Sequence, residues 1–399
     1  MRQREVFVTG MGAVSAIGNG TEAFSEALRS CRSGISCPKV LDTVHSALPV
    51  GEVGLGNDAL KALLEKRMPV PDFSTRAALL GMLALDGALE SASLCKDDCR
   101  KMVLVSSTAV GGMDETEKYY PFPGSVEENL IDRHDCGAMT DAIAARYGGF
   151  SMQTTVSTAC SAALNAIIFG CNLIKSGRAD IVVAGGAECL SKYHLNGFNS
   201  LRILDSRRCR PFDKDRAGLN LGEGAGFLVL ESSSSVRDRN ISPMASVAGY
   251  ANRCDAYHQT ASSDSGEGAC LCMSAALEDA GLAPSDISYI NAHGTGTPNN
   301  DLSEGRAIER VFGACVPPVS STKAFTGHTT AASGAIESII SLIAMRERFY
   351  PVSLGFSEKI DELSFVPVTD SRACRELRRI MVNAFGFGGN DSCVIYEKC

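Results

Sequence analysis

Short apolar segments alternate with longer segments of helical spacing along this chain, and this alternation constrains its fold more than any other feature. Residues 6–9, 101–106 and 181–184 have the β-branched, apolar character of buried strands. Residues 74–93 and 160–176 carry apolar side chains at helical spacing. Strands that alternate with helices predict an α/β fold in which helices cover the faces of a sheet.

The second half of the chain repeats this order. After a predicted strand at 227–231 come helices at 270–280, 302–312 and 335–348, and strands at 287–291, 379–383 and 393–397. The polar stretch 232–240, which includes four consecutive serines, has no apolar pattern. We therefore expect two similar halves, residues 1–236 and 237–399.

The composition is that of a large globular protein. The 399 residues are 45% hydrophobic and 21% charged, which allows an extensive core and leaves little of the chain to disorder. The formal net charge of −8, without a Lys/Arg-rich run, argues against nucleic acid as a partner. No apolar run reaches the roughly 20 residues that span a bilayer, and residues 1–10 lack a signal-peptide pattern. A soluble, cytoplasmic protein without membrane contact is expected.

The chain has sixteen cysteines, but their spacing does not indicate a metal site. No two of them are separated by two residues, and none has a histidine at zinc-finger distance, so no metal is expected. In a cytosolic protein most cysteines are small buried apolar side chains. Whether any one cysteine is a nucleophile therefore depends on its surroundings.

Cys160 has such surroundings. A strand-like stretch runs into the predicted helix 160–176, which places this cysteine in the first turn of the helix. Unpaired backbone N–H groups and the positive end of the helix dipole lie there, and both favour thiolate over thiol. The same N–H groups can stabilise an oxyanion. The alternative is a structural cysteine packed among alanines.

His293 ends the predicted strand 287–291 and is followed by a glycine-rich turn that also carries the hydroxyls of Thr295 and Thr297. Glycines there allow another backbone or a ligand to approach closely. A histidine that merely caps a turn is the alternative. A phosphate-binding loop is a weaker one, because no Lys follows at P-loop spacing.

A second histidine, His328, lies five residues after Lys323 and nine residues before Glu337. Together these three side chains can hold a neutral imidazole in a fixed tautomer. The alternative is a surface lysine beside a hydrogen-bonded turn histidine.

The segment 383–390 surrounds Phe387 with three glycines. Such a loop leaves a backbone N–H unpaired and lets the aromatic ring move. A hairpin turn with a core phenylalanine is the alternative.

Taken in order, these segments resemble the β-ketoacyl-acyl-carrier-protein synthase family, of the elongating kind. The matching motifs are residues 8–12 (VTGMG), 157–160 (STAC), 184–188 (AGGAE), 210–216 (RPFDKDR), 221–226 (LGEGAG), the two histidine segments and 386–389 (GFGG). The resemblance spans nearly the whole chain. It implies a thiolase-like αβαβα five-layer sandwich of two similar halves, usually assembled as a homodimer.

The resemblance also implies an acyltransferase reaction. Cys160 would accept an acyl group from a carrier thioester. His293 and His328 would hydrogen-bond the thioester carbonyl of malonyl carrier protein, so that loss of CO2 leaves a stabilised enolate. That carbanion would attack the acyl group on Cys160, a decarboxylative Claisen condensation that extends the chain by two carbons.

Further roles follow from the same resemblance. The backbone N–H groups of Cys160 and Phe387 would form the oxyanion hole, and the Phe387 ring would control access of the second substrate. Lys323 and Glu337 would support the electrostatics of the histidines, since a neighbouring ammonium lowers an imidazole pKa.

The resemblance assigns the substrate-binding positions as well. Thr260, Thr295 and Thr297 would line the tunnel of the phosphopantetheine arm, and Val110 and Phe198 would line the acyl pocket. For these two apolar residues, packing in the core is an equal alternative.

An acidic acyl carrier protein is the implied partner, with Arg202 as its docking residue and Lys66 and Arg67 as weaker candidates. These two could also be ordinary surface charges. No cofactor of the protein's own is implied, because substrates arrive on the carrier's phosphopantetheine. Either a homodimer or a heterodimer with a chain-length-factor-like subunit fits.

The chain departs from the family pattern around the pocket. Residues 327–334 read GHTTAASG where GHSLGAAG is usual, and Asn390-Asp391 stands where Thr-Asn is usual. Residues 215–220 also differ, and the segment between Arg202 and Arg210 is short. These changes leave the pathway open between fatty-acid and polyene or polyketide synthesis.

Three other protein classes can be weighed against this one. A non-catalytic chain-length factor, the nearest alternative, lacks the nucleophile that Cys160 supplies. A thiolase needs a second catalytic cysteine, and the surroundings of Cys393 do not match one. A dinucleotide-binding GxGxxG motif fails because Ser15 occupies its last position.

Overall fold

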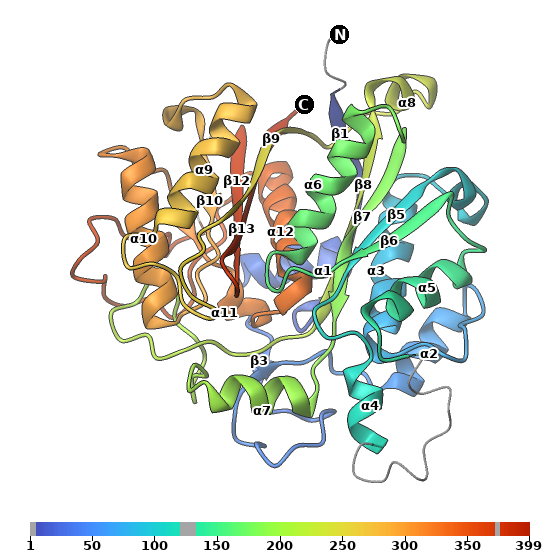
Figure 1. Ribbon diagram of the computed structural model, residues 1–399, viewed down its shortest axis with the longest axis horizontal. Helices are drawn as coiled ribbons and strands as arrows, with labels where there is room; N and C mark the ends of the chain where they lie inside the picture. Colours follow the sequence, from blue (N-terminus) through green and yellow to red (C-terminus); the bar gives the residue numbers. More distant parts are fainter. Residues whose placement is uncertain (1–4, 120–132, 372–375) are drawn as a thin grey trace.

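The computed structural model describes residues 5–119, 133–371 and 376–399, and confirms an α/β fold (Figure 1). Its strands are β1 (Val6–Ser15), β2 (Gly18–Asn19), β3 (Ile35–Ser36), β4 (Val50–Gly51), β5 (Val103–Ser107), β6 (Met152–Val156), β7 (Ile181–Glu188), β8 (Gly224–Ser232), β9 (Ala245–Cys254), β10 (Tyr289–Asn291), β11 (Val319–Ser320), β12 (Arg379–Gly386) and β13 (Asn390–Lys398).

The helices are α1 (Thr21–Arg29), α2 (Asn57–Glu65), α3 (Arg76–Ser91), α4 (Met113–Tyr119), α5 (Cys136–Arg146), α6 (Ala162–Lys175), α7 (Lys192–Ser200), α8 (Ser233–Asp238), α9 (Glu267–Ala280), α10 (Pro298–Phe312), α11 (Lys323–Thr326) and α12 (Ser333–Glu347). Within the described residues, no helix is both long and apolar enough to cross a bilayer.

The two halves repeat one sheet topology. In the first half the strands lie in the order β1-β8-β7-β5-β6, and in the second half in the order β9-β13-β12-β10-β11. In each half three neighbouring strands are parallel and the other two run antiparallel to their neighbours. The two groups join through β1 and β9, where Phe7 pairs with Ser246 and Val8 with Ala245.

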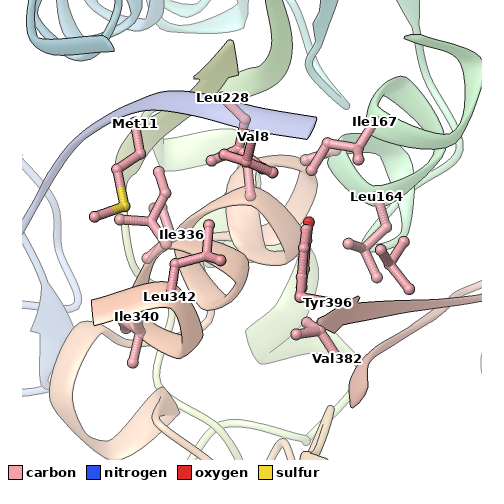
Figure 2. Close-up of a cluster of buried hydrophobic side chains, with 14 of the residues drawn as sticks. Val8, Met11, Leu164, Ile167, Leu228, Ile336, Ile340, Leu342, Val382 and Tyr396 are labelled. Atoms are coloured by element: carbon pink, nitrogen blue, oxygen red, sulfur yellow. The ribbon is translucent and has the colours of Figure 1, made fainter. Parts of the chain in front are cut away.

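Five layers result from the packing of helices on these strands. Helices α6 and α12 lie between the two groups of strands, α3 and α5 cover the outer face of the first, and α9 and α10 cover the second (Figure 1). Figure 2 shows the core of the central layer, to which β1, α6, β8, α12, β12 and β13 contribute Val8, Met11, Leu164, Ile167, Leu228, Ile336, Ile340, Leu342, Val382 and Tyr396. This is the predicted αβαβα sandwich.

Some helix and strand boundaries in the structure differ from the predicted ones. Strand β1 continues to Ser15 and β7 to Glu188, because both lie inside the sheet rather than at its edge. The serine-rich stretch forms the short helix α8, whose first turn is capped where Ser235 N donates to the Ser232 hydroxyl. Helix α6 begins at Ala162, two residues later than predicted, and this change bears directly on Cys160.

Candidate active site

Cys160 lies in a tight connection between β6 and α6, just before the helix and not within its first turn. Ala159 has a φ of 52°, a left-handed conformation that is strained for a residue with a Cβ. This turn directs the thiol into the interior, where Cys160 is 5% exposed. The sequence prediction that Cys160 begins the helix is therefore wrong, although the thiol remains next to its N-terminus.

His328 follows α11 and faces the thiol. Its Nε2 lies 3.1 Å from Cys160 Sγ, and the ring is buried. The backbone is held on both sides, since His328 N donates to Asn220 O at 2.7 Å and Gly222 N donates to His328 O at 2.9 Å. The contact between cysteine and histidine is therefore made by two fixed main-chain segments from opposite halves.

His293 lies at the end of β10, with its ring centroid 5.3 Å from that of His328 and the two rings nearly perpendicular. The Glu304 carboxylate on α10 accepts hydrogen bonds from His293 N at 2.8 Å and from Gly294 N at 2.7 Å. This carboxylate fixes the loop that presents the imidazole to the cavity.

Lys323 makes its hydrogen bonds at His293 rather than at His328. Its ammonium donates to His293 O at 2.6 Å, lies 3.3 Å from His293 Nδ1, and forms a buried ion pair with Glu337 on α12. The sequence grouped Lys323 and Glu337 with the nearby His328, whereas the fold places them behind the more distant histidine. Because an ammonium cannot accept a proton, it donates to Nδ1 and leaves the His293 proton on Nε2.

Both imidazoles are neutral near pH 7, as the sequence led us to expect. Burial lowers the pKa of His293 well below its usual value, and Lys323 and His328 lower it further. Burial also lowers the pKa of His328, with Lys323 and His194 adding to the effect.

The expected thiolate is not supported by the structure. Burial raises the pKa of the Cys160 thiol to about 11, which outweighs the opposing effects of Lys323 and of the Phe387 and Cys160 backbone N–H groups. In the free cavity the sulfur is therefore a neutral thiol beside a neutral imidazole. A nucleophile of this kind loses its proton to the adjacent base as it attacks.

The backbone N–H groups of Phe387 and of Cys160 itself both lower the pKa of the Cys160 thiol, against the larger effect of burial. They are available to an oxyanion that forms next to the sulfur. The Phe387 ring stacks on Phe198, with centroids 5.8 Å apart and planes 14° from parallel. The glycine loop therefore places a backbone N–H near the sulfur and an aromatic ring in the cavity wall.

A cavity of about 310 Å3 opens onto the thiol. Of the predicted residues it is lined by Cys160, Phe198, Thr260, Thr295, Thr297, His293, His328 and Phe387. Lys323 and Glu337 lie behind its wall. No group of three or more His, Cys, Asp or Glu side chains within the described part of the chain is arranged to hold a metal ion.

The structure does not bring the remaining predicted residues into the cavity wall. Val110 is half-buried in the turn after β5 and does not line the cavity. Arg202 is exposed and directly precedes Ile203, which does line it. Lys66 and Arg67 are exposed at the end of α2, and Arg67 Nη1 is paired with a Glu90 carboxylate oxygen at 2.9 Å.

Sequence reasoning missed several residues of the wall and one that lies behind it, His194 on α7. Its ring lies edge-on to Phe198 at 6.1 Å, and burial lowers its pKa to about 4. His194 precedes Phe198 by four residues, so helical spacing already placed both on one face. The missed residues of the wall include Asp255, His258 and Phe385.

Comparisons with known proteins agree with this fold. The model of the β-ketoacyl synthase N-terminal domain matches residues 3–235, and that of the β-ketoacyl synthase C-terminal domain matches residues 244–357. The chain belongs to the β-ketoacyl synthase family, as its motifs indicated.

Individual relatives and solved structures are similar to this chain over its whole length. The chain is 31% identical to 3-oxoacyl-[acyl-carrier-protein] synthase 2 of Vibrio cholerae and 32% identical to that of Synechocystis, covering 100% and 99% of those proteins and 100% of itself. The solved structure of the ishigamide ketosynthase/chain length factor matches with a TM-score of 0.92 at 32% identity, with both chains covered completely. A type II polyketide ketosynthase in complex with its acyl-carrier protein matches with a TM-score of 0.87 at 27% identity, again over both whole chains.

Proposed function

We propose that this protein is a 3-oxoacyl-[acyl-carrier-protein] synthase, an acyltransferase that performs a decarboxylative Claisen condensation through Cys160. The observation that carries the proposal is the 3.1 Å contact between Cys160 Sγ and His328 Nε2, beside backbone N–H groups of Phe387 and Cys160 that lower the thiol pKa. A thiol, a base and oxyanion donors at one point are what acyl transfer requires.

In the first half-reaction the Cys160 sulfur attacks the carbonyl of an acyl thioester. The thiol proton passes to His328 Nε2 and then to the departing carrier thiolate, so the proton count is unchanged. The N–H groups of Cys160 and Phe387 hold the tetrahedral oxyanion, and each such donor is typically worth about 3 kcal/mol.

In the second half-reaction malonyl thioester enters and loses CO2. The His293 Nε2–H donates to the thioester oxygen, where the enolate charge develops. Neutral His328 is the second donor once its proton has moved from Nδ1 to Nε2, the tautomer opposite to the one that accepts the thiol proton. Lys323 keeps His293 in the donating tautomer, and Glu337 balances the charge of that ammonium. The enolate carbon then attacks the acyl carbonyl carbon, the C–S bond to Cys160 breaks, and the released thiolate takes up a proton from solvent to restore the thiol.

The substrates arrive on the phosphopantetheine of an acyl carrier protein in the cytoplasm. Thr260, Thr295 and Thr297 line the route of this arm, and exposed Arg202 meets the acidic carrier beside the cavity. Phe198 and Val110 are acyl-pocket residues in this proposal. Val110 does not line the cavity of a single subunit, and a partner subunit can complete the pocket wall around it. We also retain residues 1–236 and 237–399 as the two halves, assembled as a homodimer or with a chain-length-factor-like subunit.

A non-catalytic chain-length factor remains the second candidate, because one structural neighbour is described as both a ketosynthase and a chain length factor. The complete set of thiol, imidazoles and lysine favours the catalytic role. Fatty-acid and polyketide extension use the same chemistry, and the relatives include both kinds.

The decisive variant is Cys160→Ala, with Cys254→Ala as the matched control. Cys254 is an exposed thiol whose Sγ lies 3.9 Å from Gly388 O on the same glycine loop. With acyl- and malonyl-carrier proteins as substrates, intact mass should show the two-carbon extension for the parent and for Cys254→Ala. It should show none for Cys160→Ala, and extension by that variant would refute the nucleophile.

A further inference from the structure

Asp391 is a buried carboxyl that the proposed chemistry does not use. It is the second residue of β13, where the family usually has asparagine, and it pairs in register with Phe385 on β12. The residue is only 5% exposed, and it lines the same cavity as Cys160 and His293. Among the described residues no donor makes a hydrogen bond or ion pair with its side chain.

The charged groups around Asp391 are mostly acidic. Asp255, directly after β9, and Glu304, on α10, both act on it electrostatically. Asp255 uses one carboxylate oxygen to accept from Tyr257 N at 3.1 Å. The cross-strand neighbour Arg253 is exposed and donates to Asn252 O at 2.8 Å, so its charge is directed elsewhere.

The remaining neighbours offer no compensating charge. In the first turn of α9, Gly268 lies so close that a Cβ there would collide with Asp391 Oδ2. From the same helix the Cys272 thiol contacts the Asp391 backbone oxygen at 3.2 Å rather than its carboxyl. The titratable ring of His258 lines the same cavity.

These surroundings favour the uncharged form of the carboxyl. Burial raises the pKa of Asp391 to about 8, and Asp255 and Glu304 contribute to that rise. At neutral pH most molecules therefore carry an O–H here. Since Asp391 lines the cavity and no described side chain pairs with it, a group that enters the cavity can accept this hydrogen bond.

We propose that Asp391 acts as a neutral carboxylic acid whose O–H donates a hydrogen bond to a carbonyl oxygen of the ligand in this cavity. The inference rests on the proposed function, because that function makes the ligand an acyl thioester on a pantetheine arm. A carboxylate at this position would repel the carbonyl oxygen and oppose the enolate charge. The acceptor is either an amide oxygen of the arm or an oxygen on the acyl chain.

Two variants separate hydrogen bonding from packing. Asp391→Asn keeps a donor and cannot ionise, whereas Asp391→Leu removes the donor. For the parent, kcat/KM should fall about tenfold per pH unit above pH 8. Asp391→Asn should match the parent at pH 7 within about threefold and lack this alkaline decline, and Asp391→Leu should lose roughly tenfold at every pH. The same alkaline decline in parent and Asp391→Asn would overturn the proposal.

Two substrates distinguish the amide of the arm from the acyl chain as the source of the acceptor oxygen. A saturated acyl chain has no oxygen beyond its thioester, whereas a 3-oxoacyl chain carries a ketone. Equal losses for Asp391→Leu with both substrates identify the arm amide, and a loss confined to the 3-oxoacyl substrate identifies the chain. The absence of loss with either substrate would refute donation to the ligand.

Thermal unfolding tests the protonation state without catalysis. Because the folded pKa lies above the unfolded value of about 3.9, the parent loses stability relative to Asp391→Asn as pH rises from 4 to 8. The Tm difference should be constant below pH 4, grow to pH 8 and then level. Asp97→Asn, at an exposed carboxyl, is the control. A flat difference would overturn a neutral Asp391, even in a protein that fails to condense substrates.

Discussion

In the N-terminal half the connection from β6 to the central helix α6 carries Cys160, and in the C-terminal half the equivalent connection, from β11 to α12, carries Lys323 and His328. The shared strand order makes these two connections topological counterparts. Since α6 and α12 pack together in the central layer, their preceding connections meet, and a thiol comes to lie 3.1 Å from an imidazole.

A second pair of counterparts shows how the halves have diverged. The segment after β5 carries Val110, and the segment after β10 carries His293. The first lies outside the described cavity wall, whereas the second provides a neutral donor inside it. One architecture therefore occurs twice, with the thiol in one half and the two imidazoles in the other.

The largest effects should separate the two histidines. His328→Ala removes the base at the thiol, so the rate of Cys160 acylation should fall about 10²–10⁴-fold. His293→Ala should acylate within a few-fold of the parent but condense about 10²–10³-fold more slowly, because the enolate loses a donor. Single-turnover acylation and overall condensation are measured separately. Equal losses of rate in acylation and in condensation for both variants would contradict the division of roles between His328 and His293.

The second-largest effect concerns the buried ion pair between Lys323, in the C-terminal connection, and Glu337. Lys323→Met leaves Glu337, 2% exposed, without its counter-charge and should cost roughly 3–5 kcal/mol of unfolding free energy. The double variant Lys323→Met/Glu337→Gln should recover much of this loss in urea denaturation. A single variant as stable as the parent would show that the pair is not needed for the fold.

The smallest effect lies in the N-terminal connection. Ala159→Gly should stabilise the protein by about 1 kcal/mol, because glycine adopts the φ of 52° without a steric penalty. Thr330, with a φ of 42° in the C-terminal connection, is the matched position for Thr330→Gly. Tm reports both changes, and destabilisation by Ala159→Gly would mean that the turn is not strained.

The sequence predicted the layered fold and part of the cavity wall, because glycine, cysteine and histidine motifs mark those segments directly. It placed Lys323 beside the wrong histidine, since proximity along the chain does not determine which ring a lysine reaches after folding. It did not show that burial raises the pKa of the Cys160 thiol, because the cost of burial depends on tertiary packing that no local motif contains.

Asp391 illustrates the same limit at another position. The sequence showed an aspartate where asparagine is usual, but not that the carboxyl lacks a partner among the described residues and lies near two other carboxylates. Strand and helix ends were also missed where tertiary contacts decide them, as at β1 and β7.

Peptide mapping of the acylated protein tests the central claim most directly. After brief exposure to an acyl carrier thioester without malonyl substrate, tandem mass spectrometry should locate the acyl group on Cys160, and His328→Ala should suppress the modification. An acyl group on another cysteine, or one on Cys160 that forms equally fast without the imidazole, would contradict the account.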